Sequence, residues 1–249
     1  MLFSIIIPAH NEDEYIGKCL ESIRKASVDF PEEVEVIVSI NRCSDRTEEI
    51  ARSYGSLIVH ENSKNIARVR NAAAKAASGK IIVTIDADSW MSDNMLKEIK
   101  NLLETGRYIG GGVRIMPDRY SLGIICSLIF FFIPLLLLKG VTGGLFWCYR
   151  RDFEAIEGFN EEFLTAEDLD FARRLKKLGK KSGRKYKTIN SSYIVTSTRK
   201  FEMFGHWFIF RNPRTVIKLL KGNDRELADL GYYEARNNQS KSASLTNGG

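Results

Sequence analysis

Residues 80–89 read KIIVTIDADS, in which a buried-strand pattern from Ile81 to Ile85 ends directly at two aspartates, Asp86 and Asp88. Open α/β sheets bind their ligands at the carboxyl ends of the strands. Two carboxylates two residues apart can hold Mg²⁺ or Mn²⁺, with phosphate oxygens and water as the remaining ligands. An Asp-rich turn that caps a helix starting near Ser92 explains the same residues. The triplet alone does not establish a metal site.

The chain on both sides of this strand alternates short β-branched runs with amphipathic helical patterns. Strands are predicted at residues 2–7, 34–40, 56–59, 80–85 and 143–150. Apolar residues at helical spacing predict helices that include residues 16–23, 66–73 and 169–178. This alternation predicts an α/β fold with a mostly parallel mixed sheet and helices on both faces.

Residues 1–198 are predicted to form one domain, because α/β units of roughly 200 to 250 residues commonly share a single core. Within it, residues 122–138 (LGIICSLIFFFIPLLLL) form an apolar helical segment without a charge. The segment is shorter than the roughly 20 residues of a membrane span, and Pro134 would kink it. A buried helix, an interfacial or re-entrant hairpin and a span all remain open.

The C-terminal part of the chain changes in composition. Residues 199–236 form an amphipathic extension in which aromatic residues are bracketed by arginine and lysine, a combination that suits a membrane interface. Residues 237–249 are polar and are predicted to be a disordered tail.

Two further strand ends carry polar residues of the same kind as the aspartates. Residues 8–12 (PAHNE) end the first strand, and residues 41–45 (NRCSD) end the second. Backbone N–H groups at such strand-to-helix turns can face a nucleotide. On the following helix, Arg68 and Arg70 can pair with phosphates, and Asn71 can point back to the site. Capped turns and surface arginines are the structural alternatives.

Thr165, Ala166, Glu167 and Asp168 precede the helix that includes residues 169–178. A capping Thr165 followed by acids near the positive end of the helix dipole explains this pattern. An acid held beside a sugar could equally take a proton from an acceptor hydroxyl as general base.

The chain resembles family 2 glycosyltransferases over residues 2–180. Five segments occur in the order found in that family: PAHNEDEYIGKCLESI (8–23), NRCSDRTEEIA (41–51), NIARVRNAAAKAASGKIIVTIDADS (65–89), GGLFWCYRRDFEAIEGFNE (143–161) and AEDLDFARRL (166–175). The resemblance implies a Rossmann-like GT-A fold, so that residues 1–198 would be the glycosyltransferase catalytic domain. It also implies a nucleotide-diphosphate sugar donor, a divalent cation (Mn²⁺ or Mg²⁺) and inversion at the anomeric carbon.

The resemblance assigns roles to individual residues. Asp86 and Asp88 match the D-x-D, with Asp88 as the direct metal ligand, and Asp168 matches the acid that acts as base. Glu167 would contact the acceptor, although exchanged roles of the two acids remain open. The other implied substrate-binding residues are Pro8, Ala9, Asn11 and Glu12 at the nucleotide, and Gly143 and Gly144 on the acceptor side, where a tight turn is the alternative.

Ile40 and Asn41 stand where many family members have two consecutive aspartates, the first of which contacts the base. Asn41 could still bind a base edge, and Asp45 matches the family's later aspartate, so UDP- and GDP-linked donors both remain open. His206 lies where some similar enzymes complete the metal sphere, although a structural role in its aromatic surroundings is the alternative.

A net charge of +6, with a dense basic run at residues 176–187, fits nucleic acid, lipid headgroups, a phosphorylated substrate or a solvated basic face. No groove-reading motif accompanies the run, so we expect no nucleic-acid partner. With the apolar segment and the aromatic extension, it favours a membrane surface and a lipid-linked acceptor such as polyprenyl phosphate, dolichyl phosphate or a glycolipid.

The absence of a secretory leader pattern and of paired cysteine motifs places the expected catalytic part in the cytoplasm, at the inner face of the membrane. Two other functions are consistent with parts of this sequence. A nucleotidyltransferase should carry a Gly-rich basic phosphate loop after the first strand, where this chain has the acidic PAHNEDE. A non-catalytic membrane-associated protein with a degenerate transferase fold is disfavoured by the intact Asp86, Asp88 and Asp168.

Overall fold

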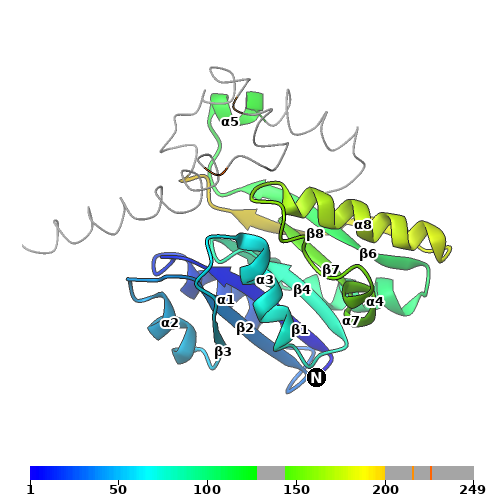
Figure 1. Cartoon of the computed structure of the whole chain (residues 1–249), viewed down its shortest axis with the longest axis horizontal. Coiled ribbons are helices and arrows are strands. Elements are labelled where there is room, and N and C mark those ends of the chain that lie inside the picture. The colour runs from blue at the N-terminus through cyan, green and yellow to red at the C-terminus, as the bar shows by residue number, and fades with distance from the viewer. Residues whose placement is uncertain (128–143, 200–214, 216–224, 226–249) are drawn as a thin grey trace, which may run out of the picture.

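The computed structural model describes residues 1–127 and 144–199, together with residues 215 and 225. Within these residues the fold is a single mixed sheet between two layers of helices (Figure 1). The predicted α/β class with a Rossmann-like arrangement is confirmed.

The described part of the sheet has eight strands in the order β3-β2-β1-β4-β7-β6-β8-β5. Strands β1 to β4 are parallel to one another, and β7 then pairs antiparallel with both β4 and β6. The strands are β1 (Phe3–Ala9), β2 (Val34–Ile40), β3 (Leu57–His60), β4 (Ile81–Ile85), β5 (Ser89–Met91), β6 (Tyr108–Pro117), β7 (Leu145–Tyr149) and β8 (Lys185–Thr196).

Strands β1 and β4 lie at the centre of the parallel half and are buried on both faces, as their continuous apolar runs predict. Alternate residues face opposite layers: Ile5 and Val83 belong to one hydrophobic cluster, whereas Ile6 and Ile82 belong to the other. The parallel register aligns the carboxyl ends of β1, β2 and β4, so the loops that follow them meet at one edge of the sheet.

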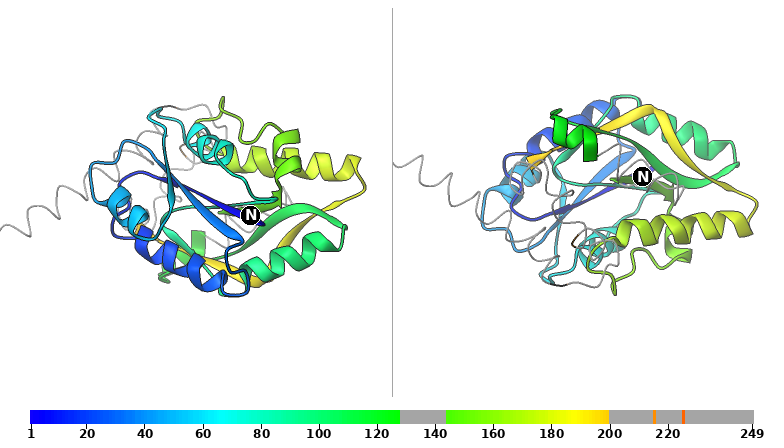
Figure 2. Two further views of the ribbon diagram at one scale, coloured as in Figure 1. Left: turned by 90° about the horizontal axis from the view of Figure 1, so that it is seen from below. Right: turned by 90° about the horizontal axis from the view of Figure 1, so that it is seen from above.

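Helices cover both faces of the sheet (Figure 2). On one side lie α1 and α4 (blue and blue-green), and on the other lie α3 and α8 (cyan and yellow-green). The apolar stripes predicted on α1 and α3 are buried, as expected. The helices are α1 (Ile16–Ala26), α2 (Thr47–Ser53), α3 (Ile66–Lys75), α4 (Met95–Glu104), α5 (Leu122–Ser127), α7 (Arg150–Ala155) and α8 (Glu167–Lys181).

Strands β5, β6 and β8 were not predicted from the sequence. Strand β6 contains three consecutive glycines, which weaken a strand pattern because they add no side chain to pack. The close approach of β8 requires one of them: a Cβ on Gly111 would lie 1.7 Å from the carbonyl oxygen of Lys187. The first residues of β8 also belong to the basic run, whose lysines are exposed at Lys176, Lys177, Lys180, Lys181, Lys185 and Lys187.

Several predicted features fall outside the described residues. Of the apolar segment at 122–138, α5 is described, and residues 128–138 are not. Gly143, His206, the tail at 237–249 and the extension at 199–236, apart from Arg199, Thr215 and Arg225, also lie outside. Among the residues that are described, none belongs to a helix with the length and hydropathy needed to cross a bilayer.

Candidate functional site

The loops after β1 and β2 are joined by hydrogen bonds between backbone and side chains. Asn11 adopts a left-handed conformation (φ 49°), and its Oδ1 accepts a hydrogen bond from the Ser44 N–H (2.8 Å). Asp45 Oδ2 accepts one from the Asp13 N–H (3.1 Å), and Asp45 Oδ1 accepts another from Thr47. Asn11 and Asp45 therefore shape the turn that follows Pro8 and Ala9.

Asp86 and Asp88 follow β4, as predicted, but their environments differ. The side chain of Asp86 is 35% exposed, whereas that of Asp88 is 5% exposed. Neither of them is the N-cap of α4, a position that Asn94 occupies. The capped-turn interpretation therefore does not account for the two carboxylates.

Arg70 joins Asp86 to the acids of α8. Its Nη2 donates to Asp86 Oδ1 (2.7 Å), and its Nη1 donates to Glu167 Oε1 (2.6 Å). The guanidinium is buried and lies 5.1 Å from the centroid of the Phe159 ring. Burial opposes the charge of Arg70, yet Asp86 and Glu167 raise its pKa further above the ordinary value. This arginine therefore stays charged between carboxylates that are 97 and 16 residues away along the chain.

Glu167 and Asp168 form the first turn of α8. The N-cap position is Ala166, in a left-handed conformation (φ 58°), so the alternative in which Thr165 is the N-cap is wrong. Asp168 Oδ1 accepts a hydrogen bond from the Leu169 N–H (2.7 Å). Burial raises the pKa of Glu167 to about 7 although Arg70 lowers it, and burial likewise raises the pKa of Asp168. The two acids therefore hold protons more readily than exposed carboxyl groups do.

Arg199 makes a second bridge on the other side of the D-x-D. Its Nη2 donates to Glu12 Oε1 (2.5 Å) and to Asp88 Oδ2 (3.1 Å), and all three side chains are buried. The guanidinium carbon lies 4.8 Å from the centroid of the Tyr15 ring. Arg199 thus connects the loop after β1 to the aspartate that follows β4.

Within the described residues, five carboxyl groups at this site face two guanidinium groups, which leaves three negative charges when all are ionised. Such an excess attracts cations. The set consists of Glu12, Asp86, Asp88, Glu167 and Asp168 with Arg70 and Arg199.

Three predicted site residues make other contacts. Asn41 is fully buried, and its amide donates to the carbonyl oxygens of Glu61 and Ser63, so a contact with a nucleotide base is not supported. Arg68 pairs with Glu161 (3.1 Å), and Asn71 holds the backbone of Phe159 at both N–H and C=O. Arg68 and Asn71 therefore hold the 159–161 loop in this structure, whereas Arg68 was expected to pair with phosphates and Asn71 to point back to the site.

Gly144 precedes β7 with φ 82°, and a Cβ there would lie 2.9 Å from Ile194 Cδ1. Backbone conformation and crowding account for this glycine, which supports the tight-turn interpretation. Its neighbour Gly143 and the candidate metal ligand His206 lie outside the described residues.

Arg70 was expected to pair with phosphates, and Arg199 was not among the predicted site residues. A signal for Arg70 exists, because it is four residues after Ile66 and three before Ala73, on the apolar stripe of α3. A charged residue on a buried stripe needs a partner. Arg199 gives no local signal, since its partners are 111 and 187 residues away along the chain.

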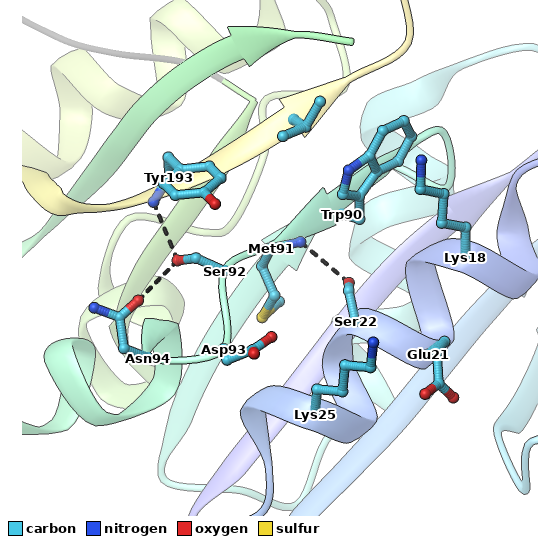
Figure 3. Close-up of a pocket in the computed structure, with 11 residues that line it drawn as sticks. Lys18, Glu21, Ser22, Lys25, Trp90, Met91, Ser92, Asp93, Asn94 and Tyr193 are labelled. Atoms are coloured by element: carbon cyan, nitrogen blue, oxygen red, sulfur yellow. Dashed lines mark hydrogen bonds between the residues drawn. The ribbon is translucent and has the colours of Figure 1, made fainter.

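A cavity of about 500 Å³ is lined by other residues than these acids (Figure 3). Lys18, Lys25, Trp90 and Tyr193 are among its lining residues, and Lys18 Nζ lies 3.4 Å from the centroid of the Trp90 ring. In Figure 3 the cavity is bounded by α1, β5 and β8.

The donor set at the D-x-D fits a hard divalent cation. Glu12, Asp86 and Asp88 offer carboxylate oxygens, the ligand type that Mg²⁺ and Mn²⁺ prefer. No group of three or more His, Cys, Asp or Glu side chains in the described part of the chain is arranged to hold a metal by itself. Phosphate oxygens and water would have to complete the coordination.

The model of the family described as "Glycosyl transferase family 2" matches residues 4–136, more than half of the chain. The chain belongs to glycosyl transferase family 2. A second family model, described as "N-terminal domain of galactosyltransferase", matches residues 134–206.

Curated relatives of this family 2 chain are longer proteins. Poly(ribitol-phosphate) beta-N-acetylglucosaminyltransferase TarS of Staphylococcus aureus is 32% identical over 105 residues, which are 39% of this chain and 18% of TarS. A Methanococcus voltae enzyme, dolichyl N-acetyl-alpha-D-glucosaminyl phosphate 3-beta-D-2,3-diacetamido-2,3-dideoxy-beta-D-glucuronosyltransferase, is 25% identical over 232 residues, 80% of this chain and 68% of that enzyme. For several relatives, this chain spans less than a third of their length.

Solved structures of glycosyltransferases share this fold. S. aureus TarS 1–349 in complex with UDP-GlcNAc aligns with a TM-score of 0.63 at 20% identity, over 80% of this family 2 chain and 59% of that chain. The mannosyltransferase PcManGT of Pyrobaculum calidifontis, in complex with GDP-Man and Mn²⁺, aligns with a TM-score of 0.61 at 19% identity, over 97% and 75%. These similarities confirm the predicted GT-A fold.

Proposed function

We propose that this chain is an inverting glycosyltransferase that moves a sugar from a nucleoside-diphosphate donor to an acceptor hydroxyl or phosphate. The observation that carries the proposal is the acid cluster, in which the buried Arg70 joins the D-x-D to the first turn of α8. Family membership supports the reaction class. The cluster supports the roles, because it brings a cation-binding pair and a candidate base into one site.

In the proposed reaction, Asp168 accepts the proton of an acceptor hydroxyl while the acceptor oxygen bonds to the anomeric carbon. The bond between that carbon and the donor's phosphate oxygen breaks, and the nucleoside diphosphate leaves with the bonding electron pair. A hydrogen bond from the Leu169 N–H holds Asp168 in place, and the raised pKa of Asp168 makes it a stronger proton acceptor than an exposed aspartate. Glu167, fixed by Arg70, would contact the acceptor.

Asp88 and Asp86 would hold the divalent cation, which we propose to be Mn²⁺ or Mg²⁺. When bound, such a cation stabilises negative charge on the departing diphosphate. The Mn²⁺ in the PcManGT complex, and in the glucosyl-3-phosphoglycerate synthase complex of Mycobacterium tuberculosis, supports this assignment. Pro8, Ala9 and Glu12 remain the proposed nucleotide-side residues, with Asn11 and Asp45 shaping their loop.

UDP- and GDP-linked donors both remain in the proposal, because solved relatives bind UDP-GlcNAc, UDP-Glc and GDP-Man. A screen for release of nucleoside diphosphate from such sugars, with Mn²⁺ or Mg²⁺, tests the function without knowledge of the acceptor. Slow hydrolysis by water should be detectable for the true donor, and no release from any donor would count against the proposal.

We further propose a lipid-linked acceptor and action at a membrane surface. The apolar segment at 122–138 and the aromatic and basic extension at 199–236 motivate this, and the Methanococcus voltae relative is named for a dolichyl-phosphate-linked acceptor. The purified protein is expected to float with anionic liposomes at low salt and to be released as salt rises. A protein that stays in the dense fraction at low salt would contradict the membrane assignment.

The rate of transfer is expected to rise with pH over the range in which the buried acids of α8 lose their protons. Burial raises the pKa of Glu167 to about 7 and raises that of Asp168, and the base must lose its proton to act. Glu167→Gln removes the neighbouring charge, so Asp168 should ionise alone and the acidic limb of the pH–rate profile should move to lower pH. If the acidic limb of the pH–rate profile is unchanged in Glu167→Gln, Glu167 does not influence the ionisation of Asp168.

The same pKa shift has a consequence for stability. The ordinary pKa of Glu167, 4.5, is lower than its value in the folded protein, so between these values the folded state binds more protons than the unfolded state. The contribution of this group to the free energy of unfolding should therefore fall as pH rises from about 4.5 to about 7.

A further inference from the structure

Arg199 forms an ion pair with Asp88, the aspartate proposed as the direct ligand of the divalent cation. Its Nη2 lies 3.1 Å from Asp88 Oδ2 and also contacts Glu12 Oε1, and the arginine side chain is 4% exposed. A guanidinium is not deprotonated in proteins, so this positive charge can leave Asp88 only if the side chain moves. A divalent cation on the same carboxylate would be repelled by Arg199 at short range.

The backbone around Arg199 is anchored next to Asp88. The Ser197 N–H donates to the Asp88 carbonyl oxygen (3.0 Å). Asp118 Oδ1 accepts hydrogen bonds from both the N–H (2.9 Å) and the hydroxyl (2.7 Å) of Thr198. The position of the guanidinium is therefore built into the fold, and a change of side-chain rotamer would release Asp88 while residues 197 and 198 stay in place.

Stability alone gives a weak reason for this arrangement. A buried arginine between two carboxylates gains little over well-packed apolar side chains, because the cost of removing the charges from water offsets their attraction. The arrangement has a clear consequence for ligand binding, however, since Arg199 offsets one of the two negative charges of Glu12 and Asp88, which would otherwise attract a cation more strongly.

We propose that Arg199 is a resident counter-cation that makes binding of the divalent cation conditional on the nucleotide. Without nucleotide, Arg199 pairs with Asp88, and the divalent cation binds weakly. A nucleoside diphosphate offers oxygens that complete the coordination of the cation and gives Arg199 another anion to pair with, so cation and nucleotide bind together. The inference rests on the proposed function and adds a residue that couples its two ligands.

The test is a titration of the full chain with Mn²⁺, followed by the loss of the electron paramagnetic resonance signal of free Mn²⁺. For the wild type, UDP or GDP should tighten Mn²⁺ binding by at least about tenfold, a typical coupling between sites. Arg199→Gln should bind Mn²⁺ at least about tenfold more tightly than the wild type without nucleotide, and its gain from nucleotide should shrink. Arg199→Lys, which keeps the charge, should resemble the wild type.

Arg24→Gln is the matched control, because Arg24 is an exposed arginine of α1 that pairs with Glu21. It should leave Mn²⁺ binding unchanged. If the single Arg199 variant does not fold, Glu12→Gln with Arg199→Gln removes the arginine together with one of its two carboxylates, and this double variant should bind Mn²⁺ more tightly than Glu12→Gln alone.

Two results would overturn the inference. If Arg199→Gln binds Mn²⁺ as weakly as the wild type without nucleotide, while nucleotide still tightens both, Arg199 is not the barrier and the proposed function stands. If neither protein binds Mn²⁺ with UDP or with GDP, the metal-dependent function itself fails, and the inference fails with it.

Discussion

Asp168→Asn is expected to lower the rate of sugar transfer by about 10² to 10⁴-fold, the usual contribution of a general base. Asparagine keeps the size of the side chain but cannot accept the acceptor's proton. The donor should bind as before, because Asp168 does not contact Arg199 or the loops after β1 and β2 in the described contacts. Transfer rates and nucleotide affinity, measured on the same protein, check both halves of this expectation.

Asp170→Asn is the matched control for Asp168→Asn. Asp170 lies in the first turn of the same helix and pairs with Arg174 (2.6 Å). Its substitution should leave the transfer rate within about twofold, because a partly exposed i, i+4 ion pair is worth about 0.3–0.5 kcal/mol. Parental transfer by Asp168→Asn, combined with loss of transfer in Glu167→Gln, would show that the two acids have exchanged roles.

Asp88→Asn is expected to weaken Mn²⁺-dependent binding of the nucleoside diphosphate by at least about 100-fold. Changes to groups that only orient metal ligands typically cost 10 to 100-fold in metal affinity, so loss of a charged direct ligand should cost at least the upper value. The side chain is 5% exposed and cannot be replaced by a mobile neighbour at low cost. Calorimetric titration with UDP or GDP, with and without Mn²⁺, measures the effect.

Asp93→Asn provides the control for Asp88→Asn. Asp93 is exposed, five residues farther along the chain, and lines the cavity of Figure 3 rather than the acid cluster. It should bind Mn²⁺ and nucleotide as the wild type does. Equal affinities for Asp88→Asn and Asp93→Asn would remove Asp88 from the metal site.

The parallel half of the fold was predictable because its strands and helices are specified by patterns within short stretches of sequence. Strand β2 was predicted with the observed boundaries, and the buried faces of α1 and α3 follow from apolar residues at helical spacing. Strand β8 was not predictable in this way. It is polar along much of its length, and its place between β6 and β5 depends on backbone pairing with distant segments.

The residues of the candidate site also differ in whether local sequence patterns could predict them. Asp86, Asp88, Glu167 and Asp168 follow strand ends or begin a helix, so local patterns and the family resemblance located them. The two arginines that hold these acids were assigned other roles or none, because each bridges segments that are far apart in the chain. Asn41 differs from them, since this polar residue at a strand end donates to the backbone of a loop that begins twenty residues farther along the chain.

The two arginine bridges make the site one electrostatic unit in which donor-side and acceptor-side acids influence each other. Arg70 contacts Asp86 of the D-x-D and Glu167 beside the proposed base, while Arg199 contacts Asp88 and Glu12. Substitutions at these positions should therefore not act additively, since residues in one ion-pair network usually show interaction energies of 0.5–3 kcal/mol.

The proposed function of this chain is to activate a nucleotide sugar for transfer. The most direct measurement is the release of nucleoside diphosphate from a panel of UDP- and GDP-linked sugars, with Mn²⁺, with Mg²⁺ and with chelator. This function predicts metal-dependent release from at least one donor, abolished in Asp88→Asn and retained in Asp93→Asn. Release that is equal in Asp88→Asn and the wild type, or absent with every donor and metal, would contradict it.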